Sequence, residues 1–155
     1  MILWRISNHA NLSGIGGVKA RGRWNSKGRR VVYLAEHPAL AMLEVLAHLE
    51  TGMDKLPDRM QFLKVDISDQ ASLKTLPEDF LASRWPARLG MTRRRGDHWL
   101  NERSSLLLKV PSVVAPESWN YLFNPLHPEA GLAMITRTFS HLLDRRLPQG
   151  RSGER

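Results

Sequence analysis

The chain has 155 residues and 42% hydrophobic content, which suits one hydrophobic core and is too short for two comfortable domains. It has no cysteine, so disulfide frameworks, thiolate zinc sites and cysteine nucleophiles are excluded, and a metal site has no support. The net charge of +8 suits an anionic partner. The sequence shows neither a leader pattern nor ~20 consecutive apolar residues, so we expect a soluble cytoplasmic protein without membrane contact.

The first third of the chain predicts strand, turn, strand and helix. Residues 3–6 begin a strand, and the glycine-rich residues 13–17 form a turn that cannot nucleate a helix. Their glycine spacing does not fit the GxGxxG dinucleotide fingerprint. The β-branched and aromatic content of residues 30–35 predicts a second strand. A helix is expected over residues 38–50, ended by residues 51–52.

The middle of the chain mixes short strands and helices. Residues 61–67 alternate apolar with polar side chains and predict a half-buried strand. A short helix is expected after Pro77, because two acidic residues follow in its first turn. We expect residues 84–96 to form a loop, residues 97–102 a helix, and residues 105–110 a buried strand.

The last part of the chain contains one ambiguous segment. Residues 119–123 are apolar and aromatic, and the proline-rich residues 124–128 predict an irregular connection. The apolar stretch 132–143 fits a strand or a helix. We expect one domain over residues 1–147 and a disordered tail over 148–155. Short strands and helices without regular βαβ alternation favour an α+β domain.

Positive charge is concentrated in three segments. Residues 19–30 carry six basic side chains, residues 84–95 carry five, and residues 145–155 have a net charge of +3. The first segment also contains glycine and asparagine, so it can hold the phosphates of a small ligand as readily as a polymer. We interpret the run Arg93-Arg94-Arg95 as a solvated surface that meets an acidic protein. A non-enzymatic module that binds nucleic acid or protein through these charges is the rival interpretation.

Glu44 is the most informative side chain, because it interrupts an apolar helical run over residues 39–49. An ionised group in such surroundings needs a partner or a function. Glu44 can pair with His48 or with an arginine, or it can act on a ligand. The same alternatives hold for Arg23, which can pack on Trp24, and for Tyr33, which can be a core aromatic.

Several short motifs occur in an order and spacing that resemble one known family. They are Arg5-Ile6-Ser7, Gly22-Arg23-Trp24-Asn25, Tyr33-Leu34-Ala35-Glu36, Ala41 to Glu44 with His48, Gly96-Asp97-His98-Trp99-Leu100, Val110-Pro111-Ser112 and Asn124-Pro125-Leu126-His127-Pro128. Together they resemble the RES domain, over residues 3–147. RES domains are the toxins of type II toxin–antitoxin pairs whose antitoxins are helix-turn-helix proteins of the Xre type.

The resemblance implies a fold like that of ADP-ribosyltransferases and an enzyme that consumes NAD as its substrate, with no prosthetic group and no metal. It also implies contact with DNA only through the antitoxin. The acceptor of the ADP-ribosyl group stays open among water, inorganic phosphate and a side chain of a target protein. The first two make the protein an NAD glycohydrolase or phosphorylase, and the third makes it an ADP-ribosyltransferase.

The resemblance also implies roles for five side chains. The catalytic residues are Glu44, Arg23 and Tyr33. An anion at Glu44 suits the oxocarbenium-like sugar that forms when the nicotinamide–ribose bond breaks. Arg23 suits the diphosphate, and Tyr33 offers a face for nicotinamide. Ser112 and Asn124 are the further binding residues, with Asn124 holding either a ligand group or the adjacent loop.

Overall fold

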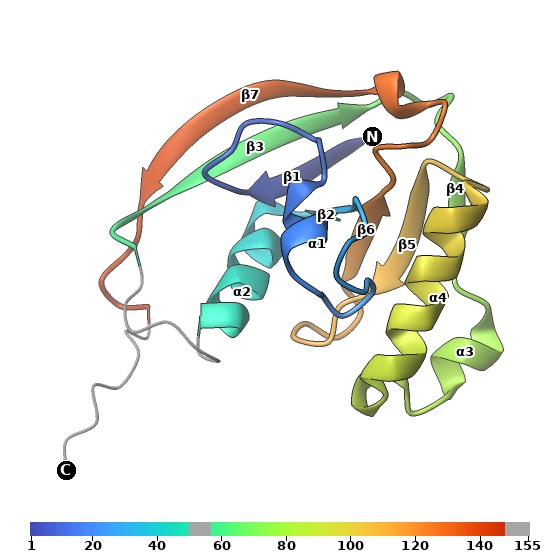
Figure 1. The fold of residues 1–155 in the computed structure, drawn as a ribbon. Coiled ribbons are helices and arrows are strands. Elements are labelled where there is room, and N and C mark those ends of the chain that lie inside the picture. Colours follow the sequence, from blue (N-terminus) through green and yellow to red (C-terminus); the bar gives the residue numbers. More distant parts are fainter. Residues whose placement is uncertain (50–56, 148–155) are drawn as a thin grey trace, which may run out of the picture.

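The computed structural model describes residues 1–49 and 57–147, which form an α+β domain around a mixed seven-stranded sheet (Figure 1). The strand order is β4-β5-β6-β2-β1-β3-β7. The strands are β1 (Ile2–Ile6), β2 (Val32–Ala35), β3 (Arg59–Ile67), β4 (Leu73–Thr75), β5 (Leu107–Pro111), β6 (Trp119–Phe123) and β7 (Ala133–Leu142). The helices are α1 (Ile15–Lys19), α2 (Pro38–Leu49), α3 (Glu78–Ala82) and α4 (Leu89–Glu102), with 3₁₀ turns η1 (Trp85–Ala87) and η2 (Ala130–Leu132).

The two faces of the sheet carry different layers. Strands β4 and β5 are parallel, and the other paired strands are antiparallel. Because side chains alternate along a strand, Leu107 joins the main hydrophobic cluster while its neighbour Leu108 packs in a second cluster with Trp99 and Leu100 of α4. Helix α2 packs on β1 and β2 through Leu40 and Ala41. Buried hydrophobic clusters thus lie on both faces of the sheet, and α2 and α4 cover one of these faces.

Most predicted elements are confirmed. The expected strands at 3–6, 30–35, 61–67 and 105–110 correspond to β1, β2, β3 and β5, and the apolar and aromatic residues 119–123 form β6. The helix at Pro38 is α2 and the one after Pro77 is α3. The residues expected to end α2, 51–52, lie outside the described residues, as does the expected tail 148–155.

The turn expected over residues 13–17 is wrong in one respect, because α1 begins at Ile15. Packing outweighs the low helix propensity of glycine here. Gly17 is buried, with no room for a Cβ beside the Arg29 carbonyl oxygen and Val31. The Gly28 N–H donates to the carbonyl oxygens of Gly17 and Val18 at 3.2 Å each. The single turn is therefore held by the chain that follows it.

The loop expected over residues 84–96 is also wrong. It contains η1 and the first half of α4, which begins at Leu89 rather than at 97. The buried positions of α4 are Thr92, Gly96, Trp99 and Leu100, which do follow a helical spacing. Two of these are not large apolar residues, so the apolar pattern was hidden.

The ambiguous stretch 132–143 is mainly strand β7, which pairs with β3 along its length. Phe139 of β7 stacks on Phe62 of β3 with 5.3 Å between ring centres. This pairing explains why the segment forms a strand and not a helix, because only a strand can form backbone hydrogen bonds along the nine residues of β3. No helix within residues 1–49 and 57–147 is long and apolar enough to cross a membrane.

Candidate active site

A cavity of about 460 Å³ opens on the helical face of the sheet between α1, α2 and β2. This volume lies within the range of small-molecule sites. Its polar lining includes Arg23, Tyr33, Glu44, His48 and Asn120, and its apolar lining includes Trp4, Ile6, Val45 and Leu49. Three of the five predicted site residues, Arg23, Tyr33 and Glu44, thus line one cavity.

The Glu44 carboxylate is held by two side chains, one directly after strand β5 and one within β6. Ser112 Oγ and Asn120 Nδ2 each donate to Glu44 Oε1 at 2.7 Å. Ser112 is itself fixed, because its Oγ accepts from the N–H groups of Val114 and Ala115 at 3.2 and 3.1 Å. Neither bond uses Oε2. One carboxylate oxygen is therefore anchored and the other carries no bond from either residue.

The expected alternative partners of Glu44 are not those that hold its carboxylate. Within α2, His48 Nδ1 contacts the backbone carbonyl oxygen of Glu44, one helical turn earlier, at 2.8 Å. None of the ion pairs found among the described residues includes Glu44. Its hydrogen bonds are those of a carboxylate oriented from the sheet.

Arg23 belongs to an irregular segment, and its guanidinium is oriented by η1. Its Nη1 donates to the Pro86 carbonyl oxygen at 3.0 Å, and its Cζ lies 6.0 Å from the centre of the Trp85 ring. Burial lowers the pKa of Arg23, while the nearby Glu44 carboxylate acts in the opposite direction by stabilising the cation. Arg23 is thus a partly desolvated cation that shares the cavity with Glu44.

The ring and the hydroxyl of Tyr33 have different surroundings. The hydroxyl donates to Asn25 Oδ1 at 2.7 Å and accepts from the Trp24 N–H at 3.0 Å. Burial of this end raises the pKa of Tyr33 well above its ordinary value. The ring lines the cavity, and 36% of the residue remains exposed. The ring is available to a ligand, while the hydroxyl holds the loop.

Helix α4 fixes the segment that carries Arg23. Thr92 Oγ1 donates to the Arg23 carbonyl oxygen at 2.6 Å, and Arg93 Nε donates to the Gly22 carbonyl oxygen at 2.8 Å. One turn later, Asp97 accepts from the Ser26 N–H at 2.9 Å and from Ser26 Oγ at 2.5 Å.

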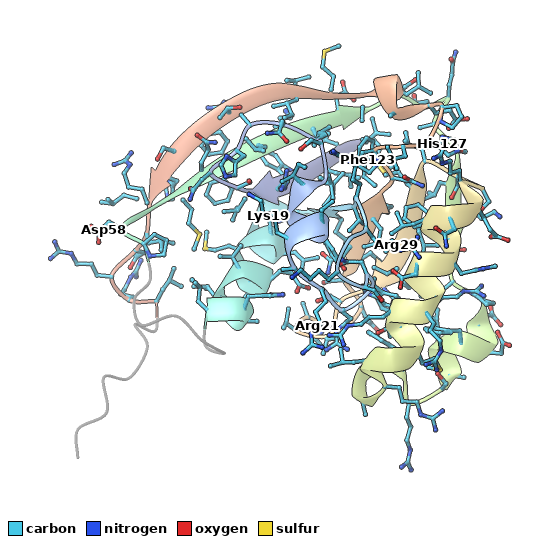
Figure 2. The ribbon with its side chains drawn as sticks, in the orientation of Figure 1. Lys19, Arg21, Arg29, Asp58, Phe123 and His127 are labelled. Carbon is cyan, nitrogen blue, oxygen red and sulfur yellow. The ribbon has the colours of Figure 1, made fainter. Side chains whose placement is uncertain are left out.

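Gly96 lies between these contacts and allows the close approach of α4. A Cβ at this position would overlap the Trp24 carbonyl oxygen. One face of α4 therefore contacts the segment 22–26 at four of its five residues. Figure 2 labels the cations Lys19, at the end of α1, and Arg21 and Arg29, which precede β2.

The other predicted binding residues have different positions. Ser112 is not one of the residues that line the cavity. It donates a hydrogen bond to the Glu44 carboxylate and so positions this group. The structure does not bring Asn124 to the cavity. Asn124 is buried, with Nδ2 donating to the Leu100 carbonyl oxygen and Oδ1 accepting from the Leu126 N–H, each at 3.1 Å. It holds the adjacent loop.

Sequence reasoning missed Asn120. Its position in β6, opposite Ala35 of β2, places it on the helical face, where an amide without a partner would be costly. A polar residue at an inward position of an apolar strand was the available signal. Among residues 1–49 and 57–147, no three His, Asp or Glu side chains converge as metal ligands.

Comparison with known proteins supports the resemblance seen in the sequence. The family model described as RES domain matches residues 2–144. A protein named Toxin Res from Pseudomonas putida is 48% identical over 135 residues, covering 87% of this chain and 92% of that protein. A protein named Prs ADP-ribosylating toxin from Sphingobium sp. is 36% identical over 137 residues, covering 82% of this chain and 84% of that protein.

A solved structure shares the fold. A chain in the crystal structure of the M. tuberculosis MbcT–MbcA toxin–antitoxin complex matches with a TM-score of 0.68, covering 91% of this chain and 84% of that chain. The identity is 16%, so this similarity shows the fold alone. It confirms the α+β architecture expected from the sequence. From the family match over nearly the whole chain and the two relatives above, the chain belongs to the RES domain family.

Proposed function

We propose that this protein is the toxin of a toxin–antitoxin pair and cleaves the nicotinamide–ribose bond of NAD. The observation that carries the proposal is the anchored Glu44 carboxylate in a cavity that also contains Arg23 and Tyr33. These are an anion, a cation and an aromatic face on one ligand-sized cavity. They match the ribose, the diphosphate and the nicotinamide of NAD.

The chemistry requires stabilisation of a developing positive charge. When the bond between ribose C1′ and the nicotinamide nitrogen breaks, nicotinamide leaves with the bonding electrons and the sugar becomes oxocarbenium-like. A carboxylate fixed beforehand by Ser112 and Asn120 stabilises that charge without having to reorganise. An acceptor then bonds to C1′ and loses a proton. With water the product is ADP-ribose, and with inorganic phosphate it is ADP-ribose 1″-phosphate.

Two findings support the toxin assignment. The 48% identical relative is named Toxin Res, and the solved structure with this fold comes from a toxin–antitoxin complex. We therefore propose a cognate antitoxin as partner, of the Xre type that the family resemblance implied, and a site of action in the cytoplasm, where NAD is found.

Transfer of ADP-ribose to a protein is the second candidate. The Sphingobium relative is named an ADP-ribosylating toxin, and it is 36% identical to this chain. The same cavity serves this reaction, because only the nucleophile that attacks C1′ changes. This version requires a target protein in addition to the antitoxin.

The test is nicotinamide release by the protein freed from co-expressed antitoxin, followed by chromatography with and without inorganic phosphate. Glu44→Gln keeps the size of the side chain and removes the anion, so we expect it to abolish release. Glu102→Gln, an exposed carboxylate on α4, is the matched control and should retain wild-type release.

The outcomes separate the candidates. Release that depends on phosphate identifies a phosphorylase, and release without it a glycohydrolase. Labelling of one protein in a cell extract by NAD, with no release in buffer, would favour the transferase. Neither release nor labelling, together with DNA affinity that falls steeply with salt, would replace the proposal with the basic binding module.

A further inference from the structure

The three arginines of the run 93–95 are not equivalent. Arg94 and Arg95 are exposed on α4. Arg93 is partly buried, and its Nε donates to the Gly22 carbonyl oxygen at 2.8 Å. The expectation of a uniformly solvated basic surface therefore does not hold for Arg93. This side chain contacts the segment that carries Arg23.

Gly22 places Arg93 next to the wall of the cavity, and Arg93 itself is not one of the residues that line it. Gly22 lines the cavity, and a Cβ there would lie 2.5 Å from the Tyr33 hydroxyl oxygen, so the two residues are in close contact. Because Arg93 is bonded to Gly22, its guanidinium lies beside the wall formed by Gly22 and Tyr33. Electrostatics agree: burial lowers the pKa of Arg23, and the positive charge of Arg93 lowers it further.

The guanidinium groups of Arg23 and Arg93 are thus neighbours beside a cavity that Arg5 and Arg21 also line. No carboxylate among the described residues forms an ion pair with Arg23 or Arg93. Arg23 uses Nη1 and Arg93 uses Nε for backbone oxygens, so each has further N–H donors for a ligand. The repulsion between two such cations is offset when an anion with two charges binds between them.

We propose that Arg93 joins Arg23 in holding the diphosphate of the dinucleotide substrate. The inference rests on the proposed function, which supplies a ligand with one negative charge on each of two adjacent phosphate groups. One guanidinium for each phosphate matches this charge and provides bidentate geometry. Arg93 is then a substrate-binding residue, and its Nε contact also positions Gly22.

The test measures binding by calorimetry in the Glu44→Gln background, where no turnover disturbs the titration. The probes are adenosine, AMP and ADP, which differ in the number of phosphates. We expect Arg93→Gln to weaken ADP binding by at least about tenfold, to weaken AMP binding less, and to leave adenosine binding unchanged. Arg93→Lys should restore part of the ADP affinity, and Arg95→Gln should leave it unchanged.

A purely structural role for Arg93 predicts a different result. Thr92→Val removes another contact of α4 with the same segment but leaves the cation in place. If Arg93→Gln and Thr92→Val weakened adenosine and ADP binding equally, Arg93 would be a support for the loop and the inference would be overturned. Unchanged ADP affinity in Arg93→Gln would also overturn it.

The wild-type assay keeps this inference separate from the proposed function. Nicotinamide release by the wild type, together with ADP affinity insensitive to Arg93→Gln, would preserve NAD cleavage and remove only the role of Arg93. No nicotinamide release, no protein labelling and no ADP affinity would remove both. The two variants Arg93→Gln and Arg95→Gln should have the same thermal unfolding temperature, which would show that the fold is intact in both.

Discussion

The cationic and anionic sides of the cavity are built in opposite ways. Glu44 lies on a regular helix, and only its side-chain oxygen is fixed by the sheet. Arg23 lies on an irregular segment whose backbone oxygens are held by α4, from residues about 70 positions away in the sequence. The anionic side therefore relies on side-chain contacts, whereas the cationic side relies on backbone contacts.

Because of this difference, substitutions on the two sides of the cavity should affect different properties, turnover on one side and stability on the other. Loss of the Asn120 amide removes one hydrogen bond from a helix that remains packed on β1 and β2. Changes at Thr92 and Gly96 on the inner face of α4 displace the chain itself. We expect the first kind to lower turnover with a small effect on folding, and the second kind to lower stability and substrate binding together.

The largest effect is expected for Gly96→Ala. Its Cβ would overlap the Trp24 carbonyl oxygen, so α4 or the segment 22–26 has to move, at a cost of about 3 kcal/mol in the free energy of unfolding. Urea denaturation measures this. Gly90→Ala, in the same helix with only the tip of Arg94 nearby, is the matched control and should be neutral or slightly stabilising. Equal effects at both positions would refute the close approach of α4.

The next effect is expected for Asn120→Ala, on the anionic side. The loss of one donor to the Glu44 carboxylate should reduce kcat for nicotinamide release roughly tenfold to a hundredfold. Ser112→Ala removes the other donor to the same oxygen and should give a loss at least as large, because the N–H groups of Val114 and Ala115 also lose their acceptor. Because both act through the carboxylate, neither should lower any residual activity further in the Glu44→Gln background. An additive loss there would contradict this.

A smaller effect is expected for Tyr33→Phe, which leaves the Trp24 N–H and Asn25 Oδ1 without the hydroxyl between them. The free energy of unfolding should fall by about 1–2 kcal/mol. Tyr121→Phe is the control, because no hydrogen bond of the Tyr121 hydroxyl is found in the described structure, and it should change stability less. A reversed order would show that the hydroxyl of Tyr33 does not support the loop.

The smallest effect concerns alkaline pH. Because burial raises the pKa of Tyr33 above its ordinary value of 10.0, the unfolded chain loses this proton first. The stability from the protonated hydroxyl is complete below pH 10 and is lost as pH rises above it. The thermal unfolding temperature of the wild type should therefore fall more steeply above pH 10 than that of Tyr33→Phe. Parallel declines would assign the effect to other groups.

What the sequence could predict depends on how local the signal is. Glu44 stood out because a carboxylate in an apolar helix is visible within one segment, and the strands followed their own alternation. Helix α4 was missed at its start because two of its buried positions are Thr92 and Gly96, whose role is to admit the neighbouring backbone. Asn120 was missed because its partner lies 76 positions earlier in the sequence. Asn124 holds the adjacent loop, and its role at a ligand stays a prediction.

The long sequence separation of these contacts has a consequence for synthesis. Helix α2 is complete once Leu49 has been added, but α4 follows only with residues 89–102 and Asn120 comes later still. A chain still growing on the ribosome therefore has Glu44 in a helix without its donors and Arg23 on a segment without its support. The cavity can be assembled only after nearly the whole domain has emerged. Any activity that depends on the complete cavity is therefore expected only after Asn120 has joined the fold.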